Sequence, residues 1–160
     1  MGTKDILGLV MAIVICQVAG VVGGLFTASS VDTWYAALTK PSFNPPNWLF
    51  SPVWITLYAL MGVALFLVFK KGLDAEGVKV ALVLFAAQLL GNVLWSVLFF
   101  GLQLPLIAFL EIVVLWVLIL LTMIKFFQIS KPAGWLLFPY LLWVGFASVL
   151  NFFLWSLNRS

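Results

Sequence analysis

Five long runs of apolar residues divide the chain, and polar connections separate them. Each run is long enough to cross about 30 Å of hydrocarbon as a helix, at 1.5 Å per residue. None has the strict alternation of a barrel strand, and lipid cannot satisfy the open edges of a sheet. The pattern therefore predicts transmembrane helices over residues 6–26, 48–69, 78–100, 105–127 and 133–157.

The first run also has features of a cleaved signal peptide. Lys4 precedes it, and the small residues of "FTASS" (26–30) follow it. Its apolar stretch is longer than the roughly 7–15 residues that are usual in a signal peptide. We therefore expect the run to be retained as the first membrane span.

Three of the four connections are short, which predicts antiparallel neighbours in a compact bundle. They are "KKGLDAEGVK" (70–79), "GLQLP" (101–105) and "QISKPAG" (128–134). The connection over residues 27–47 is longer and contains "KPSFNPPNW" (40–48) with three prolines. Because proline restricts φ, we expect an ordered loop that covers the bundle as a lid. The alternative is a simple linker that caps the second helix.

The basic residues predict the orientation of these spans. Six basic residues lie at the N-terminus and around the second and fourth connections: Lys4, Lys70, Lys71, Lys79, Lys125 and Lys131. Only two lie on the other side, Lys40 and Arg159. Positive charge accumulates in the cytoplasm. We therefore expect a cytoplasmic N-terminus, with the long loop and the C-terminus outside.

Composition agrees with an all-α integral membrane protein of one domain, residues 1–160. The chain is 65% hydrophobic and 8% charged, whereas soluble domains carry about 25% charged residues. The net charge of +3 does not indicate nucleic-acid binding, because no basic stripe alternates with exposed aromatics. With one cysteine and no histidine, neither an internal disulfide nor a metal site is expected.

The third predicted span carries polar and aromatic residues on one face. Gln88, Asn92, Trp95 and Phe99 follow one another at spacings of four, three and four. These residues can line a binding site. In the other interpretation, the two amides only form hydrogen bonds between helices, as amides in membranes commonly do.

Large aromatics also lie on single faces of the second and fifth spans. Trp54 and Tyr58 are four residues apart in the second, and the fifth has a stripe flanked by Phe146, namely Tyr140, Trp143, Ala147, Leu150 and Asn151. Aromatics from three helices can wall a pocket for a flat apolar ligand. Several of the eight tryptophans, however, lie near span ends and are typical of an interfacial belt.

Glu111 is the one acidic residue deep inside a predicted span. An ionisable group there is costly and suggests a function. The alternative is a protonated or hydrogen-bonded glutamate near the membrane face. No second carboxylate, histidine or lysine lies deep inside a span to form an acid–base pair, so hydrolytic chemistry is not expected.

Four segments together resemble the TspO/MBR family, which includes bacterial tryptophan-rich sensory proteins and the mitochondrial translocator protein. They are "WYAALTKPSFNPP" (34–46), "PVWITLYALMG" (52–62), "QLLGNVLWSVLFFG" (88–101) and "PYLLWVGFASVLNFFLW" (139–155). The resemblance implies a five-helix bundle, often a homodimer in the membrane lipid, with a pocket under the first loop. It also implies a porphyrin ligand, notably protoporphyrin IX, and no obligatory cofactor.

The resemblance also implies roles for individual residues. Tyr35 and Pro45 would belong to the lid, Gln88, Asn92 and Trp95 to the third span, and Ala147 to the pocket wall. Trp54 and Trp143 match tryptophans that face the ligand in the light-dependent porphyrin breakdown reported for some bacterial members.

Three functions follow as hypotheses. The first is a tetrapyrrole-binding sensor or regulator without enzymatic activity. The second is a photo-oxidase-like activity on bound porphyrin, for which Trp54 and Trp143 are the candidate residues. The third is transport of porphyrin or lipid, although the five spans show no inverted repeat.

Overall fold

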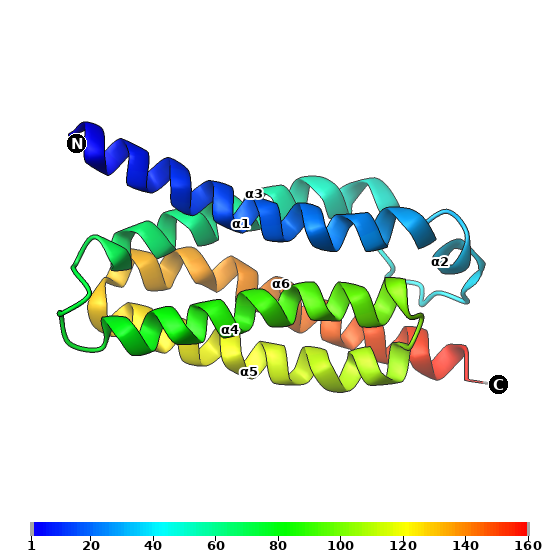
Figure 1. Ribbon diagram of the computed structural model, residues 1–160. Helices are drawn as coiled ribbons and strands as arrows, with labels where there is room; N and C mark the ends of the chain where they lie inside the picture. Colours follow the sequence, from blue (N-terminus) through cyan, green and yellow to red (C-terminus); the bar gives the residue numbers. More distant parts are fainter. Residues whose placement is uncertain (1, 160) are drawn as a thin grey trace.

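The computed structural model describes residues 2–159, and across them the chain is helical with short connections (Figure 1). The elements are α1 (Thr3–Ser30), α2 (Trp34–Ala37), α3 (Asn47–Phe69), α4 (Val78–Ser96), the π-helical η1 (Val97–Gly101), α5 (Pro105–Ile129) and α6 (Lys131–Leu157). α4 and η1 form one continuous segment, so five segments in the described chain are long and apolar enough to cross a membrane. The predicted all-α membrane bundle is confirmed.

The five long helices form a closed ring. α1 contacts α3 and α4, α3 contacts α6, α6 contacts α5, and α5 contacts α4. The N- and C-terminal ends lie at opposite ends of the bundle, and α2 lies at the C-terminal end (Figure 1). α3 and α4 follow one another in the chain but make few contacts, so they are not adjacent in the ring.

Helix α1 extends four residues beyond the predicted span, to Ser30. The Thr27 hydroxyl donates to the carbonyl of Gly23 at 3.3 Å, and the Ser29 hydroxyl donates to Phe26 at 2.7 Å. Hydroxyl groups that bond back to the preceding turn keep such polar residues within a helix. The small residues that resembled a cleavage site thus form the last turn of α1.

Two glycines allow side chains and backbone to pack tightly against one another. A Cβ on Gly62 of α3 would lie 2.5 Å from Cα of Ile13, so α1 and α3 approach with backbone against backbone. A Cβ on Gly20 of α1 would lie 2.5 Å from the ring of Tyr58 in α3. Gly24 follows Gly20 by four residues, and the two form a GxxxG pair, a spacing that often marks close helix packing. Gly24 has no atom within 4 Å of its Cβ position among the described residues.

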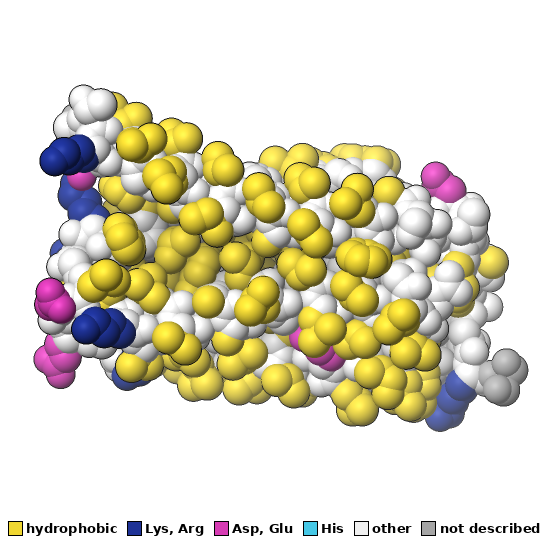
Figure 2. All heavy atoms as spheres, viewed as in Figure 1, with side chains coloured by type: hydrophobic (Ala, Val, Ile, Leu, Met, Phe, Trp, Pro, Cys, Tyr) yellow, Lys and Arg dark blue, Asp and Glu magenta, His cyan; other side chains and the backbone are white. Residues whose placement is uncertain are grey.

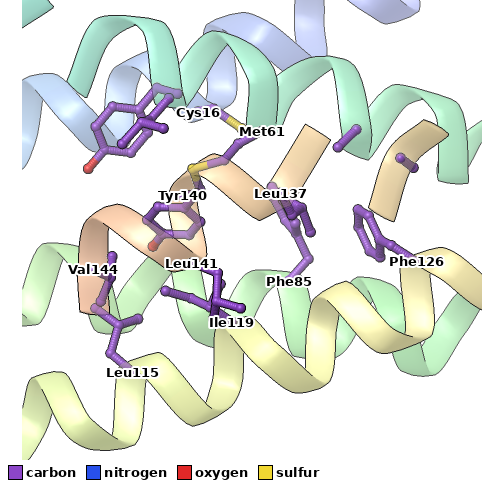
Figure 3. Packing of buried hydrophobic residues seen from close by; sticks show 14 of the residues in the cluster. Cys16, Met61, Phe85, Leu115, Ile119, Phe126, Leu137, Tyr140, Leu141 and Val144 are labelled. Atoms are coloured by element: carbon purple, nitrogen blue, oxygen red, sulfur yellow. The ribbon is translucent and has the colours of Figure 1, made fainter. Parts of the chain in front are cut away.

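The central core is filled by side chains from all five long helices, including Cys16, Met61, Phe85, Leu115 and Tyr140 (Figure 3). Tyr140 is fully buried at the centre of this cluster. A smaller cluster lies beneath α2 and includes Tyr35, Phe99, Phe100 and Leu150. The second cluster is the one that adjoins the candidate site.

Most charged side chains gather at the two ends of the molecule, and the flank between them is mainly hydrophobic, with one acidic side chain visible on it (Figure 2). At the N-terminal end, Lys70 of α3 pairs with Asp5 of α1 at 2.8 Å. A hydrophobic flank with polar ends is the surface expected of a bundle that spans lipid.

Candidate functional site

A cavity of about 550 Å³ runs from the α2 end of the bundle toward its middle. Its lining comes from α1, the residues just after α1, α2, α3, α4, η1 and α6. Tyr58, Asn92 and Trp143 are at its inner end, and Asp32, Tyr35 and Asn47 are at its loop end. The volume is within the range of roughly 300–1,000 Å³ that is usual for small-molecule sites.

Aromatic rings from three helices form the walls. Trp54 and Tyr58 of α3 lie with ring centroids 5.6 Å apart. Trp95 of α4 stacks on Phe99 of η1 at 5.2 Å, with 18° between the planes. Trp143 of α6 completes the lining. Such walls suit a large flat apolar molecule, because aromatic faces stack on one another with favourable geometry.

The π-helical turn η1 places two consecutive phenylalanines inside the bundle. Phe99 and Phe100 are both buried and both line the cavity. The amide of Leu102 donates to the carbonyl of Val97 at 2.7 Å, five residues back, and the hydroxyl of Ser30 donates to the carbonyl of Phe100 at 2.8 Å. A side chain of α1 therefore forms a hydrogen bond with the backbone of the π-helical turn. π-Bulges of this kind occur frequently at functional sites.

A chain of buried hydrogen bonds closes the inner end of the cavity. The Tyr58 hydroxyl donates to Oδ1 of Asn92 at 2.6 Å, and Nδ2 of Asn92 donates to the hydroxyl of Tyr140 at 2.9 Å. Tyr140 in turn donates to Oε1 of Gln88 at 2.9 Å. Both amides thus join helices, as the second interpretation of the α4 stripe described. Asn92 in addition lines the cavity.

Trp143 carries a polar atom that lacks a partner. Its Nε1 is buried, and no group in residues 2–159 accepts a hydrogen bond from it. A buried donor without a partner is unfavourable by about 1–3 kcal/mol. Trp143 therefore contributes the apolar surface of its ring, and not this donor, to the lining of the cavity.

The loop after α1 is ordered and covers the end of the bundle. The Tyr35 hydroxyl donates to Oδ1 of Asn44 at 2.8 Å, within the loop. The ring of Phe43 contacts those of Phe146 and Phe153 on α6, with centroids 6.3 Å and 5.3 Å away. Burial raises the pKa of the Tyr35 hydroxyl, and its hydrogen bond to Asn44 lowers that pKa by less. Tyr35 therefore stays neutral at physiological pH and keeps its donor role.

Nine of the twelve residues predicted for the site line the cavity: Tyr35, Trp54, Tyr58, Asn92, Trp95, Phe99, Trp143, Ala147 and Leu150. Three are not among its lining residues. Gln88 lies deeper, bonded to Tyr140, and Phe146 packs between Trp143 and Phe43. The carbonyl of Pro45 accepts a hydrogen bond from Nδ2 of Asn44 at 3.0 Å, so this proline helps to shape the loop.

The sequence patterns did not indicate that α1 and the start of α3 form a wall of the cavity. This set consists of Gln17, Gly20, Val21, Gly23, Gly24, Thr27 and Ala28, with Asn47, Trp48, Phe50 and Ser51. The GxxxG pair was the available signal, but it indicates helix packing in general. Small residues on a helix face also leave room for a ligand, and Gly24 does so here.

Glu111 lies outside the cavity, where α5 meets α4. Its Oε1 is 3.3 Å from the position that a Cβ on Gly91 would occupy, and its Oε2 has no hydrogen-bond partner among the described residues. Within residues 2–159, no group of three or more acidic, cysteine or histidine side chains could hold a metal ion. The polar chemistry of the cavity is therefore that of amides, hydroxyls, indoles and one carboxylate.

Comparison with known proteins agrees with this architecture. The TspO/MBR family model matches residues 12–156. The chain is 49% identical to the tryptophan-rich protein TspO of Chlorobaculum tepidum over 155 residues, covering 97% of this chain and 98% of the relative. It is 46% identical to the protein of that name in Archaeoglobus fulgidus, covering 96% and 99%. It is 37% identical to the translocator protein of Bos taurus, covering 89% and 85%.

The matched region includes most of α1, nearly all of α6, the other long helices in full and every residue that lines the cavity. Relatives with these names support a sensory or translocator role in a membrane. The resemblance read from the four sequence segments is confirmed: this chain is a multi-pass membrane protein and belongs to the TspO/MBR family.

Proposed function

We propose that this protein binds a tetrapyrrole of the protoporphyrin IX type in the cavity and acts as a sensor or regulator that responds to it. A tetrapyrrole is flat and apolar over its ring and polar at one edge. The cavity offers aromatic walls at its inner end and polar groups near the loop. Burial of the ring supplies the main driving force, because apolar area removed from water contributes roughly 25 cal/mol per Å².

One observation carries the proposal: indoles from three different helices, those of Trp54, Trp95 and Trp143, line one cavity. An interfacial belt would place them at the ends of the spans and facing lipid. Trp135, near the start of α6, is in contrast 62% exposed and does not line the cavity. The positions of Trp54, Trp95 and Trp143 are thus not explained by an interfacial belt.

The test is a fluorescence titration of purified protein with protoporphyrin IX. We expect saturable quenching of tryptophan emission with a stoichiometry near one ligand per chain. Trp143→Phe should weaken the affinity several-fold, because it removes apolar wall area from the cavity. The control is Trp135→Phe, which changes an exposed indole at the far end of α6. Quenching that never saturates would contradict the proposal.

A second candidate function is light-dependent oxidation of the bound porphyrin. It is favoured by the position of Trp54 and Trp143 on the same cavity, where both indoles would lie next to an excited ring. Dioxygen would be the oxidant. Illuminated and dark samples, each with and without dioxygen, separate this activity from simple binding. If Trp54→Phe with Trp143→Phe degrades bound porphyrin as fast as the unaltered protein, these residues have no such role.

The proposed function includes an orientation in which the ligand enters from the outer side, with the N-terminus in the cytoplasm. The six basic residues on the N-terminal side support it. Cysteine variants at Gly72 and Ser42 can be labelled in intact cells with a membrane-impermeant thiol reagent. We expect only the Ser42→Cys variant to be labelled. Labelling of only the Gly72→Cys variant would show that the orientation is the opposite of the one proposed.

Association into a homodimer in lipid is also part of the proposal. It rests on the family resemblance. In addition, small residues on lipid-facing helix surfaces allow helices to approach closely. Light scattering of the protein in detergent, corrected for bound detergent, distinguishes a mass of one chain from that of two.

A further inference from the structure

One buried hydrogen bond joins the end of α1 to η1. The hydroxyl of Ser30, the last residue of α1, donates to the carbonyl of Phe100 at 2.8 Å, and Ser30 is buried. The last carbonyls of a helix have no partner within it. The chain turns away after η1, because Gln103 has a φ of 56° and Pro105 has no amide hydrogen. Ser30 thus supplies, from another helix, a donor for a carbonyl at the end of η1.

The last two turns of α1 pack closely along the same segment. A Cβ on Gly101 of η1 would lie 2.9 Å from the ring of Phe26. A Cβ on Gly23 would lie 3.0 Å from Oγ of Ser96, the residue that precedes η1. Phe26 and Gly23 are about one and two turns before Ser30, so all three face η1. The position of η1 therefore depends on the end of α1.

The two phenylalanines of η1 contact both the cavity and the helix that covers it. Phe99 stacks on Trp95 with ring centroids 5.2 Å apart, and both residues line the cavity. The ring of Tyr35 in α2 lies 6.3 Å from that of Phe99 and 5.7 Å from that of Phe100. Trp34 of α2 lies 5.4 Å from Phe99 in an edge-on arrangement. A displacement of η1 would therefore move a wall of the cavity and the surface on which α2 packs.

We propose that Ser30 is a positioning residue of the tetrapyrrole site, although it is not among the described residues that line the cavity. Its hydroxyl keeps η1 in the π-helical form, and this form sets the positions of Phe99 and Phe100 beside both the ligand and α2. A ligand that stacks on Phe99 then also stabilises α2, so the order of the loop depends on whether the cavity is occupied. This inference rests on the proposed tetrapyrrole function, because it requires a flat ring against the aromatic wall.

Three serine variants test the proposal in the full chain, in nanodiscs of phosphatidylcholine with and without protoporphyrin IX. Ser30→Ala removes the donor, and Ser30→Thr keeps a hydroxyl at the same position. The control is Ser29→Ala, because the Ser29 hydroxyl donates to Phe26 within α1 at 2.7 Å and lies 3.5 Å from that of Ser30. Hydrogen exchange of the Leu102 amide, which donates to Val97 at 2.7 Å, reports on the π turn itself. Affinity and the absorption band of the bound porphyrin report on the site.

Without ligand, Ser30→Ala should increase exchange of the Leu102 amide about tenfold, since a buried carbonyl loses its donor. It should weaken porphyrin binding about three- to tenfold and shift the absorption band, because Phe99 leaves its stacking position. Porphyrin should slow exchange of the Ala37 amide of α2 in the unaltered protein, and less so in Ser30→Ala. Ser30→Thr should restore all of these properties, and Ser29→Ala should behave as the unaltered protein.

The outcomes separate this inference from the function on which it rests. If the Leu102 amide exchanges equally in Ser30→Ala and in the unaltered protein, Ser30 does not hold the π turn and the inference is wrong. It is also wrong if exchange increases while affinity and absorption stay unchanged, because Ser30 then has only a structural role. In both cases porphyrin still binds saturably and the tetrapyrrole function stands. If porphyrin binds saturably neither to the unaltered protein nor to any variant, the proposed function is wrong, and the role of Ser30 in the site falls with it.

Discussion

Asn158, just after the end of α6, holds the backbone of Thr39 through two hydrogen bonds. Its Oδ1 accepts from the amide of Thr39 at 2.8 Å, and its Nδ2 donates to the carbonyl of the same residue at 2.9 Å. Nδ2 also donates to the carbonyl of Leu154 at 2.8 Å, so the amide is fixed to its own helix. One side chain, 119 residues away in sequence, thus fastens the loop that covers the cavity.

We expect Asn158→Ala to loosen this loop without unfolding the bundle. The two lost hydrogen bonds to Thr39 contribute about 1 kcal/mol each, so local opening should increase about thirtyfold. Hydrogen exchange at the Thr39 amide is the measurement. Asn158→Asp should lie in between, because it keeps the acceptor and loses the donor. Ser156→Ala, on the same turn of α6, is the control, and equal exchange in all variants would contradict the role of Asn158.

Tyr140→Phe should destabilise the protein by about 2 kcal/mol. It leaves Nδ2 of Asn92 and Oε1 of Gln88 without their partner, and these side chains are 3% and 1% exposed. The unfolding midpoint in detergent is the measurement. The double variant Tyr140→Phe with Gln88→Leu should recover part of the loss, since it removes one of the two stranded groups. If Tyr140→Phe is as stable as the unaltered protein, the hydrogen bonds of Tyr140 do not contribute to the stability of the bundle.

Two alanine substitutions on α1 should differ although they are one turn apart. Gly20→Ala places a Cβ against the ring of Tyr58 and must displace it, which also disturbs the hydrogen bond to Asn92. We expect a loss of about 1–3 kcal/mol, as for overpacked cores. Gly24→Ala meets open space and should be neutral or slightly stabilising, because alanine favours the helix. Equal unfolding midpoints for the two variants would contradict the close contact between Gly20 and the ring of Tyr58.

Replacing Pro45 and Pro46 with glycine should weaken porphyrin binding while the bundle stays folded. Each proline limits the freedom of the open loop, and its loss costs about 0.4–1 kcal/mol. Together the substitutions should reduce affinity about four- to thirtyfold. The control is Pro132→Gly, in the first turn of α6 at the opposite end of the bundle. Unchanged affinity would mean that the loop is only a connection between α1 and α3.

The periodic features of the sequence determined the helices. Hydrophobic length alone predicted five spans, and the bounds of α3, α4 with η1, and α5 agree with the predicted ranges to within two residues. These features are local: a lipid-spanning helix must satisfy its own backbone and present apolar side chains over about 20 residues. The spacing of Trp54, Tyr58, Asn92 and Trp143 likewise placed them on inward faces.

The tertiary structure decided which of these faces meet and what lies between them. The ring order joins α1 to α3 and α4, so that α1 forms a cavity wall that its sequence did not indicate. The π turn at Val97–Gly101, the bonds from Gln88 and Asn92 to Tyr140, and the hold of Asn158 on Thr39 depend on partners far away in the chain. Such contacts form only when separate helices pack, and a pattern along one helix does not specify its partner.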